Sequence, residues 1–179
     1  MVDLKTKFNK EVVPEMKKKF GYKNSLAVPK LLKVVLNVGV GRTRDDKQFI
    51  ENMTGYMSLI AGQKLYPRPA RKAISSFKTR EGMIIGYSAT LRRKKMYDFT
   101  ERFINVSVPR IRDFRGFEPK SIDASGNFTV GIKEHIVFPE MIGEDIKNIF
   151  GFEVTFATSA ETKEEALEFF RLMGFPFKK

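Results

Sequence analysis

The feature that most constrains the fold is a two-residue alternation of apolar and small polar residues in four segments of the chain. Successive side chains of a β-strand point to opposite faces, so such a segment has one apolar and one polar side. The pattern predicts strands over residues 31–40, 83–92, 127–133 and 152–159. We expect the apolar sides to pack on helices and the polar sides to remain open.

The two faces can be assigned from the sequence. In the first segment we expect Leu32, Val34, Leu36, Val38 and Val40 on the apolar face, and in the second Met83, Ile85, Tyr87, Ala89 and Leu91. The opposite faces carry mainly Gly, Ser, Asn, Thr and Ala. Short side chains let a sugar–phosphate strand, an RNA minor groove or a partner protein approach closely. Ordinary solvent exposure is the alternative.

Helical patterns lie between the predicted strands without a regular βαβ alternation. Apolar residues recur every three or four positions over 3–20, 46–60 and 95–105, which is typical of amphipathic helices. Pro14 should kink or interrupt the first of them. A last helix should begin at a capping box made by Thr162 and Glu165. This mixture favours an α+β class, and 179 residues are enough for a single domain over 1–179.

The charge of the chain indicates a polyanionic partner. Lys and Arg number 33 against 21 Asp and Glu, a net charge of +12, while the 42% hydrophobic fraction is that of a folded protein. Binding to phosphates with release of counterions is the usual use of such a surplus. There is no Cys, no secretory signal and no apolar run long enough to span a membrane, so we expect a cytoplasmic protein.

Three clusters of cations stand out. A loop over 69–82 is basic and contains Phe77, and a stretch over 92–95 reads Arg-Arg-Lys-Lys. A second loop over 109–116 contains three Arg, with the aromatic residues Phe114 and Phe117 among and beside them. Arg interleaved with aromatic residues is typical of nucleic-acid-binding surfaces. A solvated charged surface is the plain alternative for any one cluster.

No catalytic pattern is present. His135 is the single histidine, and among Val137 and Phe138 a structural role is expected for it. The Gly39-Val-Gly41 sequence lacks the rest of a dinucleotide or P-loop motif. We therefore predict no enzymatic activity, no cofactor and no metal site.

Several short motifs occur in one order along the chain. They are Val34-Val-Leu-Asn-Val-Gly-Val-Gly41, Ala61-Gly-Gln-Lys64, Phe77-Lys-Thr-Arg-Glu-Gly82, Thr90-Leu-Arg92, Pro109-Arg-Ile-Arg-Asp-Phe-Arg-Gly116, Gly126-Asn127, Gly131-Ile-Lys-Glu134, Phe138-Pro-Glu140 and Gly174-Phe-Pro-Phe177. Together they resemble the bacterial type of large-subunit ribosomal protein five, a family that binds 5S rRNA. The resemblance covers essentially the whole chain.

The resemblance implies a fold and a set of partners. It implies a single α+β domain with an antiparallel sheet and helices on one face, similar to an RNA-recognition motif. It also implies a position in the central protuberance of the large ribosomal subunit, beside other ribosomal proteins. The implied RNA partners are 5S rRNA, 23S rRNA and the P-site tRNA, and a bridge to protein thirteen of the small-subunit head is implied as well.

Site residues follow from the same resemblance. The residues that match the family's 5S rRNA-binding positions are Lys33, Asn37, Gln63, Thr90 and Arg92. The loop expected to contact tRNA contains Arg71, Lys72, Ser75 and Lys78, and the expected intersubunit bridge contains Arg110, Arg112 and Arg115. The chain departs from the family pattern at Arg68, Pro69, Ala73, Arg93 and Ser125, and Pro67 and Pro69 should stiffen the base of the tRNA loop.

Three other functions are compatible with a basic α+β domain. A regulatory RNA-binding module would bind structured RNAs other than 5S rRNA. An RNA-processing enzyme would cleave RNA, which the missing catalytic residues argue against. A protein that binds acidic partners would not bind RNA at all.

Overall fold

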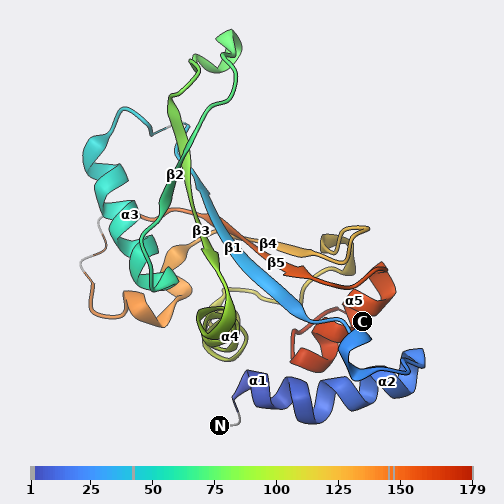
Figure 1. Cartoon of the computed structure of the whole chain (residues 1–179). Helices are drawn as coiled ribbons and strands as arrows, with labels where there is room; N and C mark the ends of the chain where they lie inside the picture. The colour runs from blue at the N-terminus through green and yellow to red at the C-terminus, as the bar shows by residue number, and fades with distance from the viewer. Residues whose placement is uncertain (1–2, 42, 145, 147, 179) are drawn as a thin grey trace. The chain divides into compact units, whose positions relative to one another are not determined.

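A five-stranded antiparallel sheet organises the computed structural model, which describes residues 3–41, 43–144, 146 and 148–178 (Figure 1). The strand order is β2-β3-β1-β5-β4. This arrangement confirms the predicted α+β class and antiparallel sheet. The strands are β1 (Leu31–Gly39), β2 (Tyr66–Pro69), β3 (Ile84–Leu91), β4 (Phe128–Ile132) and β5 (Phe152–Thr158).

The helices begin and end close to the predicted positions. α3 begins after Asp46, whose carboxylate accepts a hydrogen bond from the Phe49 N–H, and it ends at Gly62 in the left-handed conformation. Thr162 and Glu165 form the predicted capping box of α5. The helices are α1 (Leu4–Lys7), α2 (Val13–Phe20), α3 (Lys47–Ala61), α4 (Arg93–Arg102) and α5 (Lys163–Met173).

The first helical stretch is distorted beside Pro14 but is not broken by it, because the backbone stays right-handed helical from α1 to α2. The five residues Phe8–Val12 form a wide π-helical turn between α1 and α2, and Pro14 lies in the first turn of α2. Proline has no N–H to donate, so it fits where an α-helix begins and not within one. A second π-helical turn, Phe103–Ser107, follows α4.

The chain packs as two compact units, each built from separate segments. Unit 1 comprises Met1–Val34, Leu91–Val130 and Thr155–Lys179, and unit 2 comprises Val35–Thr90 and Gly131–Val154. The single-domain interpretation of 1–179 stays a prediction, so each unit is described by itself.

Phenylalanines make the core of unit 1. Phe103, Phe128 and Phe156 are fully buried, and the rings of Phe128 and Phe156 are stacked with centroids 5.8 Å apart. The ring of Phe170, from α5, lies 5.4 Å from that of Phe128. Phe175, just beyond α5, packs at 5.0 Å on Phe156. This cluster holds α5 against β4 and β5.

The core of unit 2 lies between α3 and the apolar sides of its strands. Leu36 of β1 and Met53, Met57 and Ile60 of α3 are all at most 1% exposed. Phe138 packs against Phe152 of β5 with ring centroids 5.5 Å apart.

Some face assignments from the sequence were wrong. Leu32 is exposed because the alternation changes phase at the start of β1, where Leu31 and Val34 are buried. Ile85 is also exposed, and it lines a pocket described below. Ser88 is buried on the polar side because the side chain of Arg68 covers it.

Candidate nucleic-acid interface

Three of the five 5S rRNA candidates belong to unit 2. Asn37 is exposed on β1, between the buried Leu36 and Val38. Gln63 follows the end of α3, and its side-chain amide donates a hydrogen bond to the backbone oxygen of Thr90 at 3.2 Å. The fold therefore brings Gln63 and Thr90 together from segments 27 residues apart.

Arg68 of the edge strand β2 reshapes the polar side of β3. Its Nε donates to the Ser88 hydroxyl at 2.6 Å, and its guanidinium lies 5.3 Å from the centroid of the Tyr66 ring. Stacking and hydrogen bonding hold the cation against the sheet. The polar side of β3 thus carries a fixed positive charge that the alternation pattern alone did not predict.

Lys33 and Arg92, the other two candidates, belong to unit 1. Both are exposed, and neither forms an ion pair with the described acidic residues. Arg92 precedes α4 in an extended conformation, and Arg93 has a φ of 54°. A left-handed conformation is unfavourable for arginine, because its Cβ crowds the backbone.

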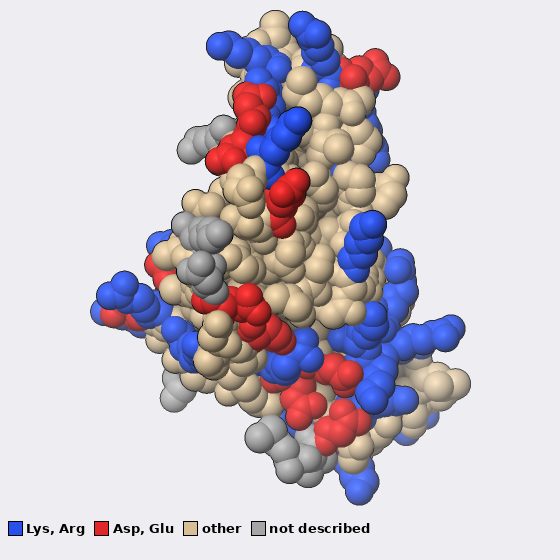
Figure 2. All heavy atoms as spheres, turned by 90° about the vertical axis from the view of Figure 1, so that its left-hand side faces the viewer, with Lys and Arg blue, Asp and Glu red and all other residues tan. Residues whose placement is uncertain are grey.

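The loop between β2 and β3 is an ordered hairpin extension. Its base closes through hydrogen bonds between Ala70 and both Met83 and Gly82, and Ile74 and Thr79 pair nearer the tip. The whole stretch 71–78 is exposed, including the predicted tRNA-contacting residues Arg71, Lys72, Ser75 and Lys78. Figure 2 shows Lys and Arg side chains gathered over this tip, at the top of the view.

The tip also presents an aromatic ring. Phe77 is 71% exposed, and the Arg44 guanidinium donates to its backbone oxygen at 3.2 Å. The turn after β1 is thereby fastened to the tip within unit 2. An exposed ring among cations is the combination expected of a surface that stacks on bases.

The second basic loop is anchored by aromatic residues. Arg110, Arg112 and Arg115 are exposed as predicted. Phe117 is buried, however, and packs on Phe114 and Phe128 with centroids 4.8 and 5.1 Å apart. The interpretation of Phe117 as an RNA-facing ring was therefore wrong, because the core of unit 1 uses it.

The C-terminal tail holds this loop in place. The Phe117 N–H donates to the Pro176 oxygen at 2.7 Å, and the Lys178 N–H donates to the Phe117 oxygen at 2.9 Å. Gly116 lies so close to Lys178 that an added Cβ would meet its backbone nitrogen at 3.0 Å. The sequence showed the Gly174-Phe-Pro-Phe177 motif but not its pairing.

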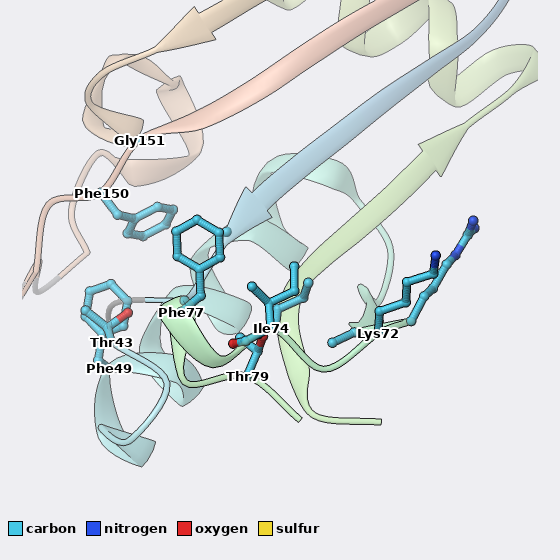
Figure 3. Close-up of a pocket in the computed structure, with 13 residues that line it drawn as sticks. Thr43, Phe49, Lys72, Ile74, Phe77, Thr79, Phe150 and Gly151 are labelled. Atoms are coloured by element: carbon cyan, nitrogen blue, oxygen red, sulfur yellow. The ribbon is translucent and has the colours of Figure 1, made fainter. Parts of the chain in front are cut away.

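A pocket of about 1010 Å³ opens in unit 2 beside the β2–β3 loop (Figure 3). Phe49, Phe77 and Phe150 lie at one end of it, while Lys72 lies at the other. Gly39 and Gly41 line it as well. No pattern in the sequence indicated this pocket, because Phe49 and Phe150 come from segments that only the fold brings together.

A ring stack supports the aromatic end of the pocket. His135 is fully buried and lies parallel to Phe150 with centroids 4.1 Å apart, and it also stacks on Tyr56 at 5.4 Å. Burial lowers the pKa of His135 below its ordinary value. The predicted structural role of His135 is confirmed, and the imidazole is neutral at pH 7.

The neutral histidine predicts an acid sensitivity. Below about pH 6.5 an unfolded His135 gains a proton while the folded one does not, so stability falls by up to about 1.4 kcal/mol per pH unit until the folded pKa is reached. Between pH 7.5 and pH 5, the melting temperature of His135→Phe should therefore fall by less than that of the wild type. Thermal unfolding followed by circular dichroism measures both losses. Equal losses would contradict the assignment.

The described residues contain no helix long and apolar enough to cross a membrane. Among them there is also no group of three or more His, Asp or Glu residues arranged to hold a metal ion.

Comparison with known proteins identifies the family of the chain. Residues 24–80 match the family model of ribosomal protein L5, and residues 84–177 match the model of the C-terminus of the same ribosomal family. The chain belongs to the ribosomal protein L5 family. It is 47% identical over 176 residues to large ribosomal subunit protein uL5 of Halothermothrix orenii, with 98% of each chain covered. The uL5 protein of Desulforamulus reducens is 45% identical and covers the chain fully, with 99% of its own length matched.

Membership in the L5 family confirms the prediction from the sequence that the chain is a ribosomal protein of the large subunit. This L5-family protein is a structural constituent of the large ribosomal subunit and not an enzyme. The RNA-processing enzyme and the acidic-protein binder are thereby set aside.

Proposed function

We propose that this protein binds 5S rRNA in the central protuberance through the polar sides of β1 and β3. The observation that carries the proposal is that Asn37 is exposed on β1 while Gln63 and Thr90 are joined at the end of β3. Short polar groups on a strand suit the 2′-hydroxyls and base edges of an RNA minor groove. Lys33 and Arg92 add phosphate contacts, which give affinity without sequence preference.

A second contact is proposed for the β2–β3 loop, with the P-site tRNA. Arg71, Lys72 and Lys78 are exposed and unpaired with the described carboxylates, so they are available to phosphates. The hydrogen-bonded base of the loop supports the tip, which reduces the entropy lost on binding. Ser75 supplies a hydroxyl donor at the same tip.

The loop that carries Arg110, Arg112 and Arg115 is the candidate for the bridge to protein thirteen of the small-subunit head. Its tether to the C-terminal tail keeps the three guanidinium groups on an anchored segment. Contacts with 23S rRNA and with other proteins of the central protuberance complete the proposed set of partners.

Two sets of single substitutions test the division between the sheet and the loop. Asn37→Ala or Thr90→Ala should each weaken 5S rRNA binding by about 5- to 10-fold, the loss typical of one or two hydrogen bonds. Lys72→Ala should leave binding of isolated 5S rRNA within about twofold, because its proposed partner is tRNA. Electrophoretic mobility shifts with labelled 5S rRNA measure all three.

The matched control is Gln48→Ala, which removes an exposed polar side chain from α3. Unchanged binding by both Asn37→Ala and Thr90→Ala would refute the sheet-side model, and a large loss with Lys72→Ala would refute the division. Far-ultraviolet circular dichroism should show wild-type spectra for all variants.

A further inference from the structure

The pocket of unit 2 has an aromatic end and a cationic end. Figure 3 shows the rings of Phe77 and Phe150 facing the same space, with Phe49 next to them, and Lys72 at the opposite end. Arg71 lines the pocket too. A nucleotide has the same division, since its base is a flat apolar ring system and its phosphate is an anion.

The aromatic wall is already in place before any ligand binds. Phe150 is 9% exposed, is stacked on the buried His135, and meets Phe49 edge to face with centroids 6.3 Å apart. Phe77, by contrast, is 71% exposed and belongs to the loop tip. One fixed ring and one exposed ring are suited to holding a base between them, and aromatic stacking accepts any base.

Two glycines, Gly39 and Gly41, line the pocket, although the packing of the protein itself does not require glycine at either position. A Cβ built on Gly39 or Gly41 would meet nothing within 4 Å, and neither residue has a positive φ. Gly86 differs, because a Cβ there would lie 2.9 Å from the Val38 oxygen. Glycine costs backbone entropy in a folded chain, and close approach by a ligand is one of its uses.

We propose that this pocket binds an unpaired nucleobase of the tRNA that the β2–β3 loop contacts, with the adjoining phosphates at Arg71 and Lys72. This proposal rests on the proposed tRNA contact, and it adds that one base of the tRNA is inserted into the pocket. We assign the inserted base to a tRNA because Arg71, Lys72 and Phe77 all belong to the loop for which a tRNA contact is proposed. Unpaired bases in loops are the part of a folded RNA that can be inserted into protein pockets.

The absence of tryptophan from the chain allows a direct test. Phe77→Trp places a single indole at the pocket, and Leu26→Trp places one at a residue of unit 1 that is 83% exposed. Titration of the full-length variants with uncharged tRNA should quench the fluorescence of Phe77→Trp saturably and leave Leu26→Trp unchanged. Inorganic polyphosphate, an anion without bases, should quench neither, and 5S rRNA should not quench Phe77→Trp.

A second pair of variants blocks the pocket itself. Gly39→Val in the Phe77→Trp chain should abolish the quenching and weaken tRNA binding about 10-fold, as expected for the loss of one stacked base. Gly131→Val is the matched control, because a Cβ there also meets nothing within 4 Å. Anisotropy of labelled tRNA measures binding separately from quenching.

The outcomes distinguish the inference from the proposed tRNA contact. Binding of tRNA without quenching would overturn the pocket inference and leave the loop contact standing. Quenching by 5S rRNA or by polyphosphate would overturn it as well, since the source or the stacking would be wrong. No binding of tRNA to any variant, with 5S rRNA still bound, would overturn both the loop contact and the pocket inference.

Discussion

Phe128→Ala should destabilise unit 1 by about 3–5 kcal/mol, the usual cost of emptying a buried phenylalanine site. Phe128 is fully buried at the centre of the phenylalanine core. Its ring centroid lies at most 5.8 Å from those of Phe117, Phe156 and Phe170, which come from three different segments. These neighbours are attached to different elements, so they cannot all move in to fill the cavity. Urea unfolding followed by circular dichroism measures the loss.

Phe114→Ala is the matched control, since Phe114 packs on Phe117 of the same cluster and is half-buried. Its loss should be less than half that of Phe128→Ala. A loss below about 1.5 kcal/mol for Phe128→Ala would contradict the core assignment, because it would be the value of a partly exposed site. Because Phe117 packs on Phe128 and anchors the loop of Arg110, Arg112 and Arg115, Phe128→Ala should also loosen the candidate bridge.

The double substitution Asn37→Ala/Thr90→Ala should weaken 5S rRNA binding by on the order of 25- to 100-fold, if the two losses add as separate contacts do. Both residues belong to unit 2, and neither side chain forms part of its buried core. The melting temperature should therefore stay within a few degrees of the wild type. The salt dependence of binding should also keep its slope, because neither residue is charged.

Lys33→Ala/Arg92→Ala is the informative counterpart. It removes two cations and no short polar group, so the slope of log affinity against log salt should fall by about one for each charge. A changed slope for Asn37→Ala/Thr90→Ala together with an unchanged slope for Lys33→Ala/Arg92→Ala would contradict the proposal that the cations, and not the short polar groups, contact the phosphates.

Much of the fold could be predicted from the sequence, because local patterns determine its elements. Alternation located β1, β3, β4 and β5, and the capping box of Thr162 and Glu165 located the start of α5. These signals act within a few residues of one another. Leu32 and Ser88 were misassigned because their burial depends on a phase change in β1 and on the side chain of Arg68 from another strand.

In the candidate site too, features set by local patterns could be predicted, and features that depend on distant segments could not. The exposure of Asn37, Lys72 and Arg112 follows from their place on a polar strand face or in basic loops. The hydrogen bond between Gln63 and Thr90 and the ring pair of Phe49 and Phe150 join distant segments, so no local pattern could predict them. The use of Phe117 in the core was missed for the same reason, because its partners lie in β4 and the C-terminal tail.

Titration of the purified protein with 5S rRNA and with a length-matched structured RNA, at two salt concentrations, is the decisive test of 5S recognition. We expect a preference for 5S rRNA that persists at the higher salt, because the fit of the polar strand faces is not screened as phosphate contacts are. Equal binding of both RNAs, lost steeply as salt rises, would show that charge alone drives binding and would contradict recognition through Asn37 and Thr90.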